Sequence, residues 1–225
     1  LIKMKNYTGE KAPYTRKDLL RHLKELQPEG FVLDSKKLEF VKQEENRRLV
    51  LTIYTTNHFP HFVQFSGAAA EIAFPQVEEI YNYILKDYPT GWGYGLDSVT
   101  INESMANDLS DTDEKFLFDN FVEDDADFQV VKPMLKSQVQ LALQWFDQFP
   151  TLESVHNHAV GLIPQVRATF IVTPVKVRMA IIKKLLDKSD YLSYIDNLIA
   201  VYQSENLPEE ENFTVALKNY LAENY

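Results

Sequence analysis

The chain contains no cysteine. This absence excludes disulfide bonds, thiol nucleophiles and cysteine-ligated metals, and it fits a reducing compartment. Long apolar runs are also lacking, since no stretch approaches the roughly 18 apolar residues of a membrane span. The first residues, LIKMKNYTGEK, show no apolar run typical of a signal peptide. We therefore expect a cytoplasmic protein that does not enter a membrane.

Glycine is scarce, and three of the seven glycines lie in the stretch PTGWGYGLDS at 89–98. A phosphate-binding loop places its glycines between a strand and the start of a helix. Here they follow an expected helix and precede an expected strand. The dinucleotide fingerprint would need glycine at position 96, which is Leu96, and the Gly-Lys-Ser/Thr ending of a phosphate loop is absent. The sequence therefore predicts no nucleotide and no cofactor.

Two large aromatic residues, Trp92 and Tyr94, separate these glycines. Aromatic side chains are common both in protein cores and among the residues that dominate protein interfaces. Two interpretations are therefore open. Either the two rings fill the core beneath a tight loop, or they stand out as contacts for a partner.

The formal net charge is −10, which disfavours nucleic acid as a partner because a phosphate backbone would be repelled. The charge is uneven: residues 103–127 hold ten acidic residues against one lysine, a local charge of −9. Residues 1–24 hold seven basic and two acidic residues, a local charge of +5. The acidic run is either a solvated surface partly paired with the basic N-terminal part, or a docking surface for a basic protein. The candidate binding residues are Trp92, Tyr94, Asp111, Asp113, Glu123, Asp124 and Asp125.

Residue periodicity in the first hundred residues predicts a mixed α/β arrangement. A helix is expected in TRKDLLRHLKEL, where Thr15 and Asp18 have the spacing of a capping box. A second helix is expected in PQVEEIYNYILKDYP. Strands with short connections, which favour antiparallel pairing, are expected in FVLDS, KLEFVKQ, RLVLTIYTT, HFVQFSG and SVTIN.

The second half of the chain is predicted to be mainly helical. Ser110 and Asp113 can begin a short helix, which EDDADF then interrupts, and a long helix is expected from Pro133. One strand is expected in QVRATFIV, among further helices in LESVHNHAV, from Thr173, in DYLSYIDNLIAVYQSEN and from PEEE. The predicted fold class is α+β, an N-terminal antiparallel sheet with flanking helices followed by a mainly helical part. The expected divisions are 1–103, an acidic connection at 104–128, and 129–225, or one continuous domain.

Four of the five histidines form two close pairs, which raises the hypothesis of a metal site. On a strand, His58 and His61 would point to opposite faces, and Pro60 disfavours a helix there. On the expected helix, His156 and His158 would diverge by about 200°. Neither pair is a natural chelate in its predicted setting. A metal site stays open as a hypothesis if all four histidines converge in the fold and Asp or Glu completes the site.

No assembled catalytic motif is present: the chain lacks GxSxG, SxxK, HExxH and the residue order of a calcium-binding loop. The favoured hypothesis is therefore a non-catalytic protein-binding module with an acidic docking surface. Small bacterial inhibitor and immunity proteins act in this way, and the comparison is an analogy only. The alternative is a metal-dependent hydrolase that uses the paired histidines and carboxylates. The sequence does not indicate the oligomeric state.

Overall fold

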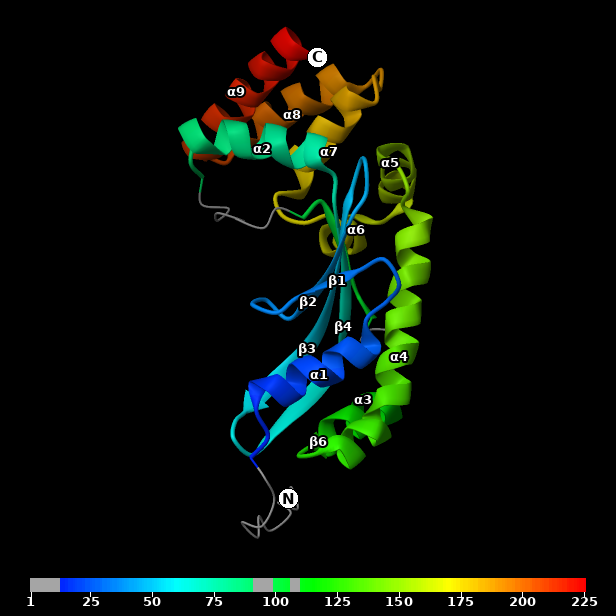
Figure 1. Ribbon diagram of the computed structural model, residues 1–225. Helices are drawn as coiled ribbons and strands as arrows, with labels where there is room; N and C mark the ends of the chain where they lie inside the picture. The colour runs from blue at the N-terminus through cyan, green and yellow to red at the C-terminus, as the bar shows by residue number, and fades with distance from the viewer. Residues whose placement is uncertain (1–12, 91–98, 106–109) are drawn as a thin grey trace.

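The computed structural model describes residues 13–90, 99–105 and 110–225 (Figure 1). An antiparallel sheet in the N-terminal half is followed by a helical C-terminal part, as the α+β prediction stated. The strands pair in the order β1-β2-β3-β4-β5, and β6 also pairs with β4. Their bounds are β1 Val32–Asp34, β2 Glu39–Gln43, β3 Arg48–His58, β4 Phe62–Ala73, β5 Ile101–Ser104 and β6 Phe121–Val122.

The long hairpin of β3 and β4 is the centre of the sheet. Its register pairs Tyr54 with Gly67 and then Thr55 with Phe65, so Ser66 has no opposite residue and forms a bulge. Gly67 has a φ of 135°, a conformation that L side chains rarely adopt, which explains a glycine at this point. Beyond the bulge, the small residues Ala68 and Ala70 are fully buried. They leave room for other elements to approach β4.

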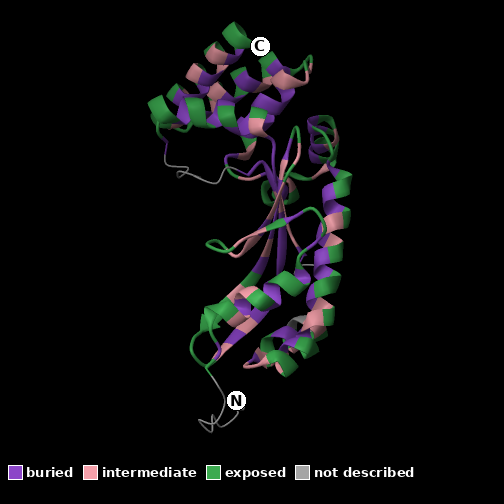
Figure 2. Ribbon diagram, viewed as in Figure 1, coloured by how far each residue is buried: buried purple, intermediate pink, exposed green. Residues whose placement is uncertain are grey.

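The helices form two groups around this sheet (Figure 1). Helices α1 (Arg16–Leu26), α3 (Asp111–Asp119) and α4 (Asp125–Gln148) lie along the sheet, with α3 and α4 packed on β4 and α1 against α4. At the other end, α2 (Pro75–Asp87) packs against α7 (Val175–Leu185) and α9 (Pro208–Asn224). The remaining helices are α5 (Leu152–Gly161), α6 (Pro164–Phe170) and α8 (Tyr191–Ser204). Figure 2 shows buried residues in both groups and along the sheet between them.

The side-chain caps predicted at the starts of two helices are confirmed. Thr15 and Asp18 form the expected capping box of α1, and Ser110 caps α3 by accepting a hydrogen bond from the Asp113 amide. Both caps depend on contacts within three residues, which a sequence displays directly.

Two predictions from the sequence were wrong, one about the type of an element and one about where a helix begins. Residues 164–170 form helix α6 instead of a strand, and only Ile171 makes an isolated bridge to Ile101. Pro164 occupies the first turn of this helix, where its missing amide hydrogen is tolerated. Helix α4 begins at Asp125 rather than near Pro133, because the Asp124 side chain accepts from the Asp127 amide and caps it. Pro133 lies inside the helix.

A buried ion pair joins the helical end to the sheet. Glu78 of α2 is 4% exposed and Arg178 of α7 is 2% exposed. The guanidinium donates from Nε to Glu78 Oε1 (2.9 Å) and from a terminal nitrogen to Oε2 (2.8 Å), a bidentate contact. The Thr100 hydroxyl, just before β5, also donates to Glu78 Oε1 (2.8 Å) and accepts from the Phe74 amide. One carboxylate therefore connects α2, α7 and the approach to β5.

We expect Arg178→Met to lower the free energy of unfolding by about 3–5 kcal/mol, because the Glu78 carboxylate would remain buried without its cation. The double variant Glu78→Leu/Arg178→Met should lose less stability than Arg178→Met alone, since no charge is then left buried. Urea denaturation of both variants measures the difference. Lys176→Met, an exposed site on the same helix, is the control. A double variant less stable than Arg178→Met would contradict this account.

Candidate binding groove between α3 and α4

Helix α3 is held against the sheet by its C-terminal connection. The short strand β6 that follows it pairs with β4 through Val63 and Val122. The Gln64 side chain of β4 donates to the Phe118 carbonyl of α3 (2.9 Å). The strand pairing and this side-chain hydrogen bond fix α3 beside β4 and opposite α4.

Helix α4 is held at both ends by charged side chains from other elements. At its C-terminal end, the Arg47 guanidinium donates to the carbonyls of Phe146 (2.6 Å) and Phe149 (2.8 Å). A cation there complements the helix dipole and satisfies terminal carbonyls. At its N-terminal end, Arg21 makes two hydrogen bonds to Asp125 (2.6 and 2.7 Å).

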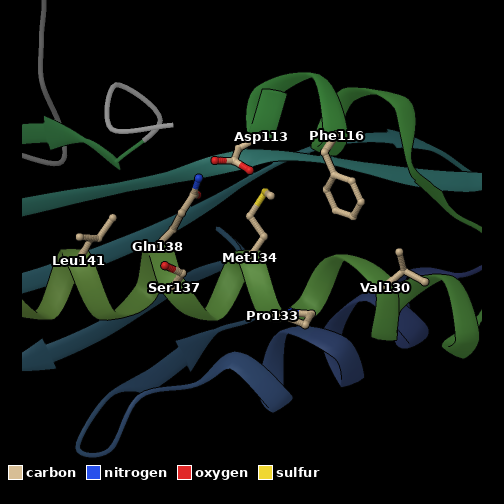
Figure 3. Close-up of a pocket in the computed structure, with 8 residues that line it drawn as sticks. All are labelled: Asp113, Phe116, Val130, Pro133, Met134, Ser137, Gln138 and Leu141. Atoms are coloured by element: carbon tan, nitrogen blue, oxygen red, sulfur yellow. The ribbon is translucent and has the colours of Figure 1, made fainter. Parts of the chain in front are cut away.

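Between the two helices lies a groove of about 430 Å³ (Figure 3). In Figure 3 the Phe116 ring and the Met134 side chain point toward one another across it, and Asp113 projects into it from α3. The groove is lined by Asp113, Phe116, Val130, Pro133, Met134, Ser137, Gln138 and Leu141. Its walls are therefore mainly apolar, with a few polar groups among them.

Gln138 is the unusual residue of this groove. Its side chain rises from α4 toward the α3 side of the groove (Figure 3), and the residue is only 1% exposed. Within the part of the chain that the structure describes, neither Nε2 nor Oε1 has a hydrogen-bond partner. A buried polar group without a partner costs about 1–3 kcal/mol, so such groups call for a structural or functional explanation.

The acidic candidate residues are divided between two neighbouring sites. Asp113 lines the groove, where its side chain accepts from the Ser110 hydroxyl (2.8 Å). Glu123, Asp124 and Asp125 instead line a second pocket, of about 370 Å³, beside α1. Asp111 begins α3, and its side chain is outside the described part. The other two candidates, Trp92 and Tyr94, lie outside the described residues altogether.

The second pocket borders a buried network centred on His22. His22 is fully buried, its ring stacks on Phe128 with centroids 4.1 Å apart, and its Nε2 lies 2.9 Å from Asp125 Oδ1. Because an ionised carboxylate only accepts, Nε2 donates to Asp125, and Nδ1 lies 2.9 Å from the Tyr14 hydroxyl oxygen. Burial raises the pKa of Tyr14 well above its usual value, so the phenol stays protonated. The row of three residues resembles a catalytic relay, but it has no activated nucleophile.

The two histidine pairs lie on elements at different ends of the sheet (Figure 1). His58 ends β3 and its ring contacts Phe62, whereas His61 lies in the turn that follows. His156 and His158 both lie on α5, where His158 packs edge-on against Phe149 and Phe170. The structure does not bring the four side chains together. Among residues 13–90, 99–105 and 110–225, no group of three or more potential ligands is placed to hold a metal ion.

Sequence reasoning missed Gln138 and His22 as site residues. A signal was available for Gln138, because it falls on the apolar face of α4 with Val131, Leu135 and Ala142, all of them buried. A polar residue on such a face is either satisfied within the core or kept for a ligand. His22 carries a similar signal on the stripe of α1 that contains Leu19, Leu23 and Leu26.

Comparisons of the chain with protein-family models, with curated proteins and with solved structures found no match. Within the described residues, no helix has both the length and the apolar character needed to cross a membrane.

The Asp125 carboxylate should make stability depend on pH. Hydrogen bonds from Arg21, and then from His22, hold the pKa of Asp125 well below its usual range. A lowered folded-state pKa contributes stability that is complete above the unfolded value of about 3.9 and is lost as the pH falls toward the folded value. We expect the stability difference between the wild type and Asp125→Asn to be steady near pH 5 and to shrink toward about pH 2. Denaturation at several pH values measures it.

Asp147→Asn provides the matched control for this experiment, since Asp147 is an exposed carboxylate on the same helix. The difference in unfolding free energy between Asp147→Asn and the wild type should change less over the same pH range. Equal pH dependence for the two variants would show that the contacts of Asp125 with Arg21 and His22 do not operate in solution.

Proposed function

We propose that this chain is a non-catalytic protein-binding module, and that the groove between α3 and α4 is its docking site. The observation that carries the proposal is the buried Gln138 amide, which lines the groove and has no partner within the described chain. A purely structural groove would gain stability from an apolar residue at this position. A groove that receives a partner can retain the amide, because the partner then satisfies it.

The charge around the groove supports a basic partner. Residues 103–127, which include all of α3 and the start of α4, carry a local charge of −9. Several of these carboxylates also have structural contacts, such as the cap formed by Asp124 and the pair of Asp125 with Arg21. Their summed field still attracts a basic surface, and such attraction acts mainly on association rate and on the choice of partner.

The metal-dependent hydrolase alternative gains no specific support from the described residues. The histidine pairs lie on separate elements, and the row formed by the buried Tyr14 and His22 with the exposed Asp125 lacks an activated nucleophile. Binding without catalysis is therefore the function that we propose.

A pair of matched valine substitutions tests the docking site. Val130 lines the groove and is 53% exposed, whereas Val160 lies on α5 and is 48% exposed. We expect Val130→Arg to weaken partner binding at least about tenfold, since it adds bulk and positive charge to a site for a basic partner. Val160→Arg should bind as the wild type does. Affinity purification from the native host at low and moderate salt, with mass spectrometry and then titration of the captured protein, measures both.

Circular dichroism should show that both valine variants stay folded, because both positions are exposed. A partner retained with unchanged affinity by Val130→Arg would place the docking surface elsewhere on the molecule. A partner lost equally by both variants would show that the added charge, rather than the groove, is responsible.

A further inference from the structure

The chemistry of the groove also specifies what occupies it, and this step rests on the proposed function. We infer that the groove receives an extended peptide segment of a basic partner protein, and that the backbone of one of its residues pairs with the Gln138 side chain. The groove brings together three groups: the amide of Gln138, the apolar pair Phe116 and Met134, and the carboxylate of Asp113.

The Gln138 amide needs a donor and an acceptor at the same time. Its Oε1 accepts and its Nε2 donates, and both atoms are buried without partners in the described chain. In an extended chain, the N–H and C=O of one residue point to the same side, which is why opposed residues in antiparallel strands exchange two hydrogen bonds. A single residue of an extended segment therefore offers the pair of groups that Gln138 lacks. A fatty acid tail or an aromatic hydrocarbon offers neither group.

The walls of the groove suit an apolar side chain on the same segment. Phe116 and Met134 face one another from α3 and α4 (Figure 3), and both are partly buried. Met is unbranched and adaptable, so it can adjust to an inserted side chain. Main-chain hydrogen bonds supply affinity in this mode of recognition, and the pocket for the side chain supplies specificity.

The charge at the groove selects basic residues beside that apolar one. Asp113 lines the same groove, in a region whose local charge over residues 103–127 is −9. A lysine or arginine flanking the apolar residue meets a favourable potential, whereas a glutamate is repelled. The expected segment is thus basic–apolar–basic in an extended conformation.

The first experiment tests the hydrogen bonds with a single-residue probe. N-acetyl-leucine methylamide presents the N–H and C=O of one leucine residue, with its apolar side chain, between two amide groups. Its ester analogue, the methylamide of O-acetyl-leucic acid, replaces the leucine N–H by an ester oxygen. NMR titration of the wild-type chain should show shifts of the Gln138 side-chain and Met134 methyl resonances, with a dissociation constant on the order of 1 mM for the amide. The ester should bind at least about tenfold more weakly, because Gln138 Oε1 would again lack a donor.

The second experiment changes the protein at two glutamines of the same helix. Gln138→Met removes the amide and keeps the approximate shape, and Gln140→Met is the matched control, since Gln140 is exposed and does not line the groove. Gln138→Met should abolish the preference for the amide over the ester and should raise the melting temperature by about 2–4 °C, because an unpartnered buried group is removed. Gln140→Met should change neither.

The third experiment tests the flanking charge. Acetyl-Lys-Leu-Lys methylamide should bind at least about tenfold more tightly than acetyl-Glu-Leu-Glu methylamide, and the difference should shrink as salt rises. Equal affinity of the two peptides would overturn the assignment of a basic segment. A melting temperature lowered by Gln138→Met, or an unchanged preference for the amide, would show that Gln138 has an internal partner and would overturn the backbone pairing.

These results are separable from those that test the proposed function. Loss of the captured partner in Val130→Arg together with no binding of any peptide probe would leave the docking groove in place and overturn only the identity of its occupant. Full partner binding by Val130→Arg would instead overturn the docking groove and this inference with it.

Discussion

The buried contact between Glu78 and Arg178 is the constraint on which the arrangement of the molecule depends. Helices α2 and α7 are separated by about a hundred residues in sequence, and this bidentate pair fixes one against the other. The Thr100 hydroxyl donates to the same carboxylate and so connects the residues just before β5 to this pair. Since burying two charges is costly unless every hydrogen bond is made, the pair tolerates few alternative packings. It thereby sets how the helical end meets the sheet.

The groove depends on a second set of contacts, which position α3 and α4. Arg47 and Arg21 hold the two ends of α4, and β6 ties α3 to β4. With both helices held in this way, a partly apolar space remains between α3 and α4. Gln138 lines the side of this space that adjoins the core. Rigid helices that carry a preformed site reduce the entropy that a partner must lose on binding.

Several acidic residues of the run 103–127 stabilise local structure. Asp124 caps α4, and Asp125 pairs with Arg21 and His22, so part of the charge stabilises local structure. One further carboxylate of the run, Asp113, lines the groove. Because the acids of this run are divided between helix caps, ion pairs and the groove, charge density alone did not locate the groove. The polar residue that singles out the groove is uncharged.

The sequence by itself determined the class of fold, the capping of α1 and α3 and most helices and strands, because those features arise from contacts within a few residues. It also showed Gln138 on an apolar helical face. Only the tertiary structure decided three features: residues 164–170 form a helix, the two histidine pairs lie apart, and Gln138 lines a groove without a hydrogen-bond partner among the described residues. These outcomes depend on which distant elements pack together, and that packing is settled by buried surface and paired charge across the whole chain.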